Sequence, residues 1–403
     1  MTGPTGRAGP LSHARRWRQG VVQDVTAPEV TDLSPGYLEP ALLPVDLVRG
    51  AYADQLAAFG SAALSYGENR GMIELRALLA DRLDSAHTGR PRPEHLLLTA
   101  GTSHALHLIG TTLAAPGQVV LVERLGYDFG RQILHDCGLL VREFGTDPDE
   151  LDQALRRAAA ERAKVAFVYL NPTFHNPTGT VMSLQRRERV VDVLARHRVP
   201  AVEDAAYAEL DLDGIEVPPS LGALAGYRGV IQLGTFAKTL APGLRLGWLV
   251  AAPGIVERLA GHGVLLSGGS PNHTTSLAVA GLVRDGDYDR HLGWLRVRLR
   301  ERRDALLGGF GAELAMDFDF DPPAGGFFVW LRSRGRHTEQ DLVDAAARVG
   351  VRVAGGSRFG TTRQPSIRLA YSFNPPDRLA TAAAELATAW TSKTGALDGV
   401  FHQ

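Results

Sequence analysis

One lysine in this chain stands where its side chain could act as a nucleophile. Lys238 follows the apolar run at 230–234, with Thr235 three positions before it and Arg245 seven positions after it. An enclosed lysine at the end of a strand has a lowered pKa, and its neutral amine can form a Schiff base with a carbonyl compound. The arginine offers a planar fork of donors that suits phosphate. A lone lysine is usually a solvated surface charge, but the apolar, glycine-rich flanks oppose that interpretation.

Polar side chains also follow two other apolar runs that we expect to be strands. Asp204 ends the run at 201–204, Tyr207 lies three positions further on, and Asn176 lies in a proline-containing loop after the run at 165–170. Ligands bind outside the carboxyl ends of parallel strands, so these side chains should face one site. A carboxylate there can keep a pyridine nitrogen protonated, which makes the ring an electron sink. Taken alone, each residue fits equally well as a cap, a packed tyrosine or part of a rigid turn.

A short glycine turn precedes the helix that we expect at 102–115. Gly101, Thr102 and Ser103 lie at the N-terminus of this helix, where free N–H groups and the helix dipole favour a phosphate. Tyr127 follows the next apolar run and could stack over a flat ring. An amine, a carboxylate, phosphate donors and an aromatic face are the groups that a phosphorylated pyridine aldehyde requires.

Alternating apolar and amphipathic runs indicate which elements must position these residues. From 96 to 204 the alternation predicts an α/β fold with a mostly parallel sheet that helices cover on both faces. Only ten positions separate the runs at 230–234 and 245–251. A parallel crossover needs about a dozen residues or more, so one of these two strands should be reversed.

The character of the chain changes after about residue 285, where a smaller α+β domain is expected. Its expected elements are helices at 288–308 and 338–349 and short strands near 327–331, 351–354 and 367–370. The predicted parts of the chain are a flexible N-terminal arm at 1–24, an extended segment at 25–50 that contributes to the small domain and the active-site groove, a large ligand-binding domain at 51–285 and a small C-terminal domain at 286–403.

Composition excludes several classes of protein. The formal net charge of −1 over 403 residues argues against a protein that binds nucleic acid. The single cysteine, Cys137, excludes an internal disulfide, and its apolar surroundings favour a small buried side chain. No apolar stretch is long enough for a membrane span, and none follows the N-terminal arginines as a signal peptide would require. We expect a cytoplasmic protein with no metal site.

These motifs, in this order, resemble those of fold-type I enzymes that use pyridoxal 5'-phosphate (PLP), in the aminotransferase class I and II group. The resemblance extends over about residues 33–386. It is most specific at 176–179, at Asp204 with Tyr207, and at Lys238 with its flanking threonine and arginine. The residue pattern is most similar to that of the aminoadipate and kynurenine aminotransferase branch.

The resemblance implies a role for each candidate residue at the cofactor. Its implied contacts are a Schiff base at Lys238, the ring nitrogen at Asp204, the ring 3'-hydroxyl at Tyr207 and Asn176, ring stacking at Tyr127, and the phosphate at Gly101, Thr102, Ser103, Thr235 and Arg245. Two departures from the family pattern leave this set intact. Ala237 stands where relatives often have serine, so one phosphate hydroxyl is lost, and Leu125 stands where they often have proline.

Three further residues are implied at the substrate and at a subunit boundary. Arg368 would clamp the α-carboxylate of the substrate, near Asn176, and Gly36 belongs to the N-terminal segment beside it. Tyr66 would reach the phosphate site of a neighbouring subunit, which implies a homodimer with shared active sites.

The cofactor motifs leave the reaction open. Transamination between an α-amino acid and a 2-oxo acid is the main hypothesis. The alternative is a non-transaminating enzyme of secondary metabolism that catalyses cyclisation, β/γ-replacement, annulation, or oxidative deamination or decarboxylation, because fold does not settle function. The chain also resembles the aminotransferase-like domain of MocR-type regulators, but its short N-terminal arm leaves no room for a winged helix. A non-catalytic protein would not need Lys238 and Arg368, and both are present.

Overall fold

The computed structural model describes residues 30–83, 90–335 and 337–391, so the expected arm at 1–24 lies outside the described residues. A seven-stranded sheet, ordered β2-β8-β7-β6-β5-β3-β4, forms the centre of the large domain. Its strands are β2 (Leu96–Thr99), β3 (Val119–Glu123), β4 (Leu140–Phe144), β5 (Val165–Leu170), β6 (Ala201–Asp204), β7 (Val230–Thr235) and β8 (Gly247–Val250). β8 runs antiparallel to both β7 and β2, which confirms the expected reversed strand.

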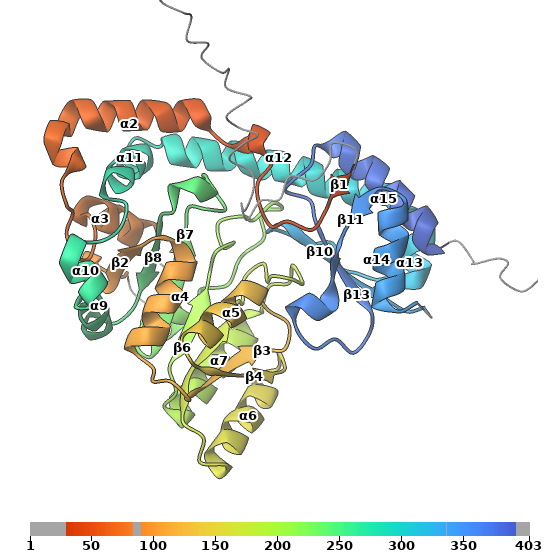
Figure 1. Ribbon diagram of the computed structural model, residues 1–403, viewed down its shortest axis with the longest axis horizontal. Coiled ribbons are helices and arrows are strands. Elements are labelled where there is room, and N and C mark those ends of the chain that lie inside the picture. The colour runs from red at the N-terminus through yellow and green to blue at the C-terminus, as the bar shows by residue number, and fades with distance from the viewer. Residues whose placement is uncertain (1–29, 84–89, 336, 392–403) are drawn as a thin grey trace, which may run out of the picture.

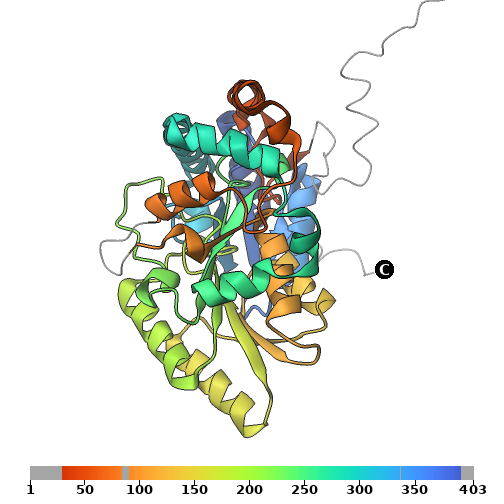
Figure 2. The same cartoon turned by 90° about the vertical axis from the view of Figure 1, so that its left-hand side faces the viewer.

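Helices cover both faces of this sheet, as Figure 2 shows. One face packs mainly against α4 (Gly101–Thr112), α5 (Asp128–Asp136), α9 (Pro253–Ala260) and α10 (Gly263–Gly268). The other face packs against α6 (Pro148–Ala160), α7 (Leu184–His197) and α8 (Leu221–Leu224). α6 begins at residue 148, where the Asp147 side chain caps it and a proline occupies its first position.

The smaller domain contains a four-stranded sheet with the order β12-β13-β10-β9. Its strands are β9 (Phe318–Asp319), β10 (Phe328–Ser333), β12 (Ala354–Gly355) and β13 (Ser366–Ala370), and its helices are α13 (Gly311–Asp317), α14 (Glu339–Arg348) and α15 (Pro376–Thr391). The single strand expected at 351–354 is instead two strands in separate sheets. β11 (Val351–Arg352) pairs in parallel with β1 (Thr31–Asp32), so the N-terminal segment lies on this domain.

Four helices connect the two domains or cover the outer edge of the large sheet. They are α2 (Val45–Phe59), α3 (Ile73–Arg82), α11 (His273–Arg284) and α12 (Asp287–Gly309). In Figure 1, α12 runs along the top of the molecule from the large domain to the small one, where it packs on α15. The division proposed at 50/51 falls inside α2, and the division at 285/286 falls directly before α12.

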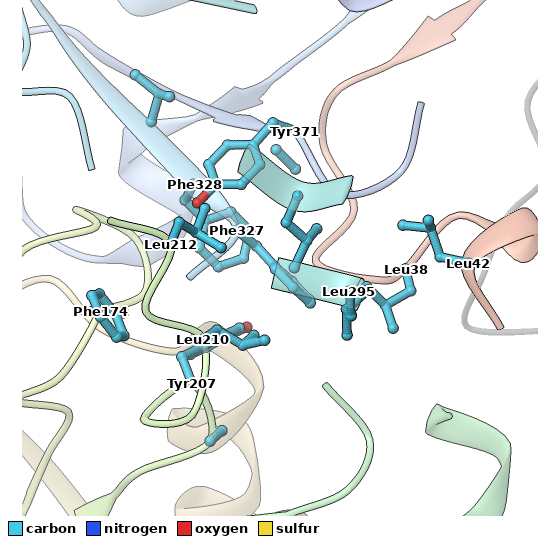
Figure 3. Packing of buried hydrophobic residues seen from close by; sticks show 14 of the residues in the cluster. Leu38, Leu42, Phe174, Tyr207, Leu210, Leu212, Leu295, Phe327, Phe328 and Tyr371 are labelled. Carbon is cyan, nitrogen blue, oxygen red and sulfur yellow. The ribbon is translucent and has the colours of Figure 1, made fainter. Parts of the chain in front are cut away.

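One apolar cluster fills the space between the domains. Tyr207 and Phe174 of the large domain are buried in the same cluster as Phe327, Phe328 and Tyr371 (Figure 3). Leu38 and Leu42 of the N-terminal segment belong to it as well. No helix within the described ranges is long and apolar enough to cross a membrane.

Candidate active site

A cavity of about 910 Å³ opens beside the carboxyl ends of β5, β6 and β7. The predicted site residues that line it are Gly36, Thr102, Ser103, Tyr127, Asn176, Asp204, Tyr207, Thr235, Lys238, Arg245 and Arg368. The large-domain residues meet because parallel strands present their carboxyl ends at the same edge of the sheet, whereas Gly36 and Arg368 come from the N-terminal segment and from β13 of the small domain.

The Lys238 amine lies in an enclosed, aromatic part of this cavity. Its Nζ donates a hydrogen bond of 2.8 Å to the Gly36 carbonyl oxygen and lies 5.6 Å from the centre of the Tyr207 ring. Burial lowers the pKa of Lys238 to about 8, and the neighbouring Asp204 carboxylate opposes this effect. About a tenth of the amine is therefore neutral at pH 7, compared with less than about a thousandth for an exposed lysine, and a nucleophilic or basic amine must be neutral.

Asp204 is buried at the end of β6. Its Oδ2 accepts a 2.7 Å hydrogen bond from the Tyr169 hydroxyl, and its Oδ1 accepts one of 3.1 Å from the Ala206 N–H. Burial raises the pKa of Asp204, whereas these two donors lower it. The carboxylate lines the cavity, and there it could face a protonated ring nitrogen.

Two side chains that the sequence singled out at the ring hydroxyl lie on the same side of the cavity. Tyr207 packs edge-on against Phe327 and Phe328, with ring centres 5.3 and 5.7 Å away. Asn176 accepts a 2.8 Å hydrogen bond from Arg368 through Oδ1, and its N–H donates one of 2.8 Å to Asn171 Oδ1. The structure thus ties the expected cofactor contact Asn176 to the expected substrate contact Arg368.

The opposite end of the cavity has the geometry of an anion site. Gly101 begins α4 with a φ of +81°, and Arg245 Nη2 donates a 2.8 Å hydrogen bond to the Ala100 carbonyl. A Cβ atom at Gly101 would stand 3.0 Å from Arg245 Nη2. The positive φ favours glycine at this position, and an added Cβ would press on the guanidinium beside the first turn of the helix, whose free N–H groups favour phosphate.

Replacing Gly101 with alanine should weaken cofactor binding about tenfold, because the new methyl group displaces Arg245 from the helix N-terminus. Titration of the apoprotein with PLP, followed by visible absorbance, measures this. Gly117→Ala is the matched control, since Gly117 has a φ of +83° and nothing within 4 Å of an added Cβ. Both variants should lose about 1 kcal/mol of stability from backbone strain. Equal affinity for PLP in the two variants would contradict the assignment.

Arg368 is buried between two aromatic rings. Its guanidinium carbon lies 4.1 Å from the centre of the Phe328 ring and 4.3 Å from that of Phe359. Its Nη2 donates to the Ser34 carbonyl oxygen, and burial lowers the pKa of Arg368 to about 10. Arg368 forms no ion pair with any described residue, so a buried cation with neutral partners lies ready for an anionic ligand.

Sequence reasoning missed several residues around the cavity. Tyr169 and Asn171 lie behind Asp204, Tyr37 lies 5.7 Å from Lys238 Nζ, and Asp128 and Arg358 form a 2.6 Å ion pair at the rim. Tyr169 and Asn171 had a signal, because they lie at the end of β5 and directly after it, immediately before the loop that carries Asn176. The ion pair of Asp128 and Arg358 joins segments 230 positions apart, and no pattern in the sequence indicated it.

Tyr66 does not line this cavity. Its side chain is 87% exposed, and its ring lies beside Gly268 of α10. His175, to which the sequence gave no catalytic role, is buried with Nε2 3.5 Å from Glu123 Oε2 and does not line the cavity either. The described residues contain no cluster that could hold a metal ion.

The fold and the site define a class: a fold-type I enzyme whose cavity carries a lysine amine, a carboxylate and a phosphate cradle, the donor set that PLP requires. Residues 29–386 match the family model of aminotransferase class I and II. The chain therefore belongs to the aminotransferase class I and II family.

Relatives and solved structures agree with this assignment. The 2-aminoadipate transaminase of Thermus thermophilus is 32% identical, with 86% of each chain covered. The crystal structure of α-aminoadipate aminotransferase from the same species, complexed with N-(5'-phosphopyridoxyl)-L-leucine, is 29% identical, with a TM-score of 0.78 over 90% of this chain and 92% of that one. An uncharacterized HTH-type transcriptional regulator of Bacillus subtilis, YisV, is 31% identical over 88% of this chain and 72% of its own length. The cofactor is PLP, and the reaction is transamination rather than the alternative chemistries.

Proposed function

We propose that the 910 Å³ cavity is the active site and that Lys238 is its central residue. The observation that carries this proposal is the meeting of three groups in one cavity: an amine with a lowered pKa, a buried carboxylate at Asp204 and a buried guanidinium at Arg368. These are the groups that transamination of an α-amino acid needs: a proton carrier, an electrostatic partner for the ring and a carboxylate clamp.

The residues at the two ends of the cavity would hold the cofactor in one orientation. Lys238 would bind it covalently, Asp204 would face its ring nitrogen, and Tyr207 and Asn176 would contact its ring hydroxyl. Tyr127 would stack on the ring. The phosphate would lie among Gly101, Thr102, Ser103, Thr235 and Arg245. When bound, PLP supplies an electron-accepting ring that stabilises the negative charge left when an amino acid loses its α-proton.

Some residues of the chain would bind the substrate, and one would transfer its proton. Arg368 binds the substrate α-carboxylate and fixes the α-carbon relative to Asn176 and Gly36. Lys238 would be the proton carrier: its neutral Nζ would accept the proton that the substrate α-carbon loses, hold it, and donate it again later in the reaction. The Asp204 carboxylate would face the ring nitrogen, and the Tyr207 ring forms part of the aromatic surroundings of Lys238. A 2-oxo acid then accepts the amino group by the same steps in reverse.

The proposed working unit is a cytoplasmic homodimer with two shared active sites. Its support is an exposed apolar surface near the end of α2 and α10. Leu64, Val264 and Leu266 are at least 60% exposed there, and Tyr66 is exposed beside them. Surfaces of this kind mark protein–protein contacts. In such a dimer Tyr66 would contact the phosphate of the neighbouring subunit.

The visible spectrum tests the proposed function directly. Purified protein with its bound chromophore is given a panel of amino acids without any 2-oxo acid, first in air and then without oxygen. Conversion to a stable spectrum of the aminated cofactor, reversed by a 2-oxo acid, is the expected result and identifies the donor. A requirement for oxygen or for an electrophilic second substrate would contradict transamination.

The pKa of Lys238 predicts how cofactor attachment depends on pH. Because this pKa is lowered to about 8, the reactive neutral amine falls about tenfold for each pH unit below 8 and changes little above it. The rate of covalent attachment to the apoprotein should follow the same curve. Stopped-flow absorbance between pH 6 and pH 10 checks this, and a rate that keeps rising to pH 10 would contradict it.

A further inference from the structure

A buried phenol lies behind the proposed cofactor partner Asp204. Tyr169 belongs to β5, is only 5% exposed and does not line the cavity. Its hydroxyl donates a 2.7 Å hydrogen bond to Asp204 Oδ2. A hydrogen bond to a charged acceptor is stronger than one between neutral groups, and it fixes the orientation of that acceptor.

The remaining bonds of Asp204 show that its orientation is specified from three directions. Oδ1 is held by the Ala206 N–H, and the main-chain oxygen accepts a bond from the Asn171 side chain. Tyr169 is the one described side chain that bonds to Oδ2. Without its hydroxyl, that oxygen would keep its position only through its contacts on the cavity side.

A glycine on a facing helix leaves the space that this phenol occupies. A Cβ atom at Gly130 of α5 would stand 3.2 Å from the Tyr169 hydroxyl oxygen and 3.1 Å from Cδ1 of Tyr127, the proposed stacking residue. Alanine is the better helix former by about 1 kcal/mol. Glycine at position 130 therefore leaves room for the rings of Tyr127 and Tyr169, although it lowers the helix propensity of α5.

We propose that Tyr169 is a positioning residue, which holds the ionised Asp204 carboxylate against the ring nitrogen of the cofactor, and that Gly130 provides the room that its phenol needs. This inference rests on the proposed role of Asp204. The alternative is that Tyr169 is a core side chain of the large domain whose hydroxyl bonds to the nearest acceptor.

A cofactor analogue separates these explanations. In 1-deaza-PLP a C–H group replaces the ring nitrogen, so the analogue keeps the aldehyde, hydroxyl and phosphate but has nothing for Asp204 to bind. Equilibrium binding of PLP and of the analogue to the full-length apoprotein is measured by quenching of protein fluorescence. The quantity of interest is the ratio of the two affinities, which requires no turnover.

Tyr169→Phe should weaken PLP binding about tenfold and leave binding of the analogue unchanged, so that the ratio falls. Gly130→Ala should lower the same ratio, and it keeps the test available should the phenylalanine variant fold poorly. Tyr371→Phe is the matched control. Its hydroxyl is fully buried and donates to the Gly326 carbonyl oxygen, 2.7 Å away, but its side chain does not line the cavity. Its ratio should equal that of the unmodified protein.

Asp204→Asn distinguishes failure of this inference from failure of the proposed site. If Asp204→Asn lowers the ratio and Tyr169→Phe does not, the positioning role is overturned and the site stands. If Tyr169→Phe weakens both ligands equally, the phenol is a packing residue and the inference is overturned. If Asp204→Asn leaves the ratio unchanged, the assignment of Asp204 itself is wrong, and the inference is overturned with it.

Discussion

Replacing Lys238 with alanine is expected to abolish covalent attachment of the cofactor and to lower turnover at least about a thousandfold. No other described lysine lines the cavity, and the groups around Nζ are a backbone carbonyl and aromatic rings. None of these groups can take over as a base near neutral pH. Visible absorbance of the purified protein and single-turnover kinetics with the identified donor measure the two effects.

Lys164→Ala is the matched control for this variant. Lys164 lies in the turn before β5, outside the cavity, so both the absorbance and the turnover should remain unchanged. Residual activity above a few per cent in Lys238→Ala would overturn the central assignment.

The second large effect is expected at the substrate clamp. Arg368→Lys should lower kcat/KM for the amino acid about a hundredfold, because lysine cannot reproduce the planar, two-donor contact with a carboxylate. The substituted ammonium group would also lose the stacking between Phe328 and Phe359. Affinity for PLP should change little, because Arg368 is not itself a proposed cofactor contact and bonds only to one of them, Asn176. Steady-state kinetics and a PLP titration of the same preparation separate the two quantities.

A buried arginine elsewhere controls for the general cost of this substitution. Arg302 of α12 is 6% exposed and pairs with Glu39, away from the cavity. Arg302→Lys should lower the thermal midpoint without changing kcat/KM. If Arg368→Lys behaved in the same way, the arginine would be a structural residue and the clamp would have to lie elsewhere.

The large domain was the most predictable part of the chain, because its pattern is local. The buried strands β2, β3 and β5 are mostly apolar runs, and each is followed by a helix; Ser183, for example, caps α7 after β5. The length of one connection predicted that either β7 or β8 is reversed, and the structure shows that the reversed strand is β8. Where parallel strands are adjacent, the positions after their carboxyl ends converge, so the sequence predicts that Asn176, Asp204 and Lys238 share one site, and all three line the cavity.

Contacts between distant segments could not be predicted in this way. The sequence gives no sign that Arg368 stacks between two phenylalanines or that Ser34 accepts a bond from it across 334 positions. The division of residues 351–355 between two sheets also depends on β1, which lies about 320 positions earlier in the chain. Such features arise from packing of the whole chain rather than from any window of it.

The apolar cluster between the domains has a consequence for how the protein unfolds. Its members include Trp248 on the large sheet, Leu295 on α12 and Leu369 on the small sheet, all in one contiguous core. The Tyr288 hydroxyl on α12 also lies 2.7 Å from Thr239 Oγ1, one residue after Lys238, the proposed catalytic lysine. The two domains therefore share one apolar core in addition to the clusters inside the large domain, and we expect heat to melt them together in a single transition. The cofactor-binding half is not a transferable module, because cutting the chain before α12 would remove part of the core on which Lys238 rests.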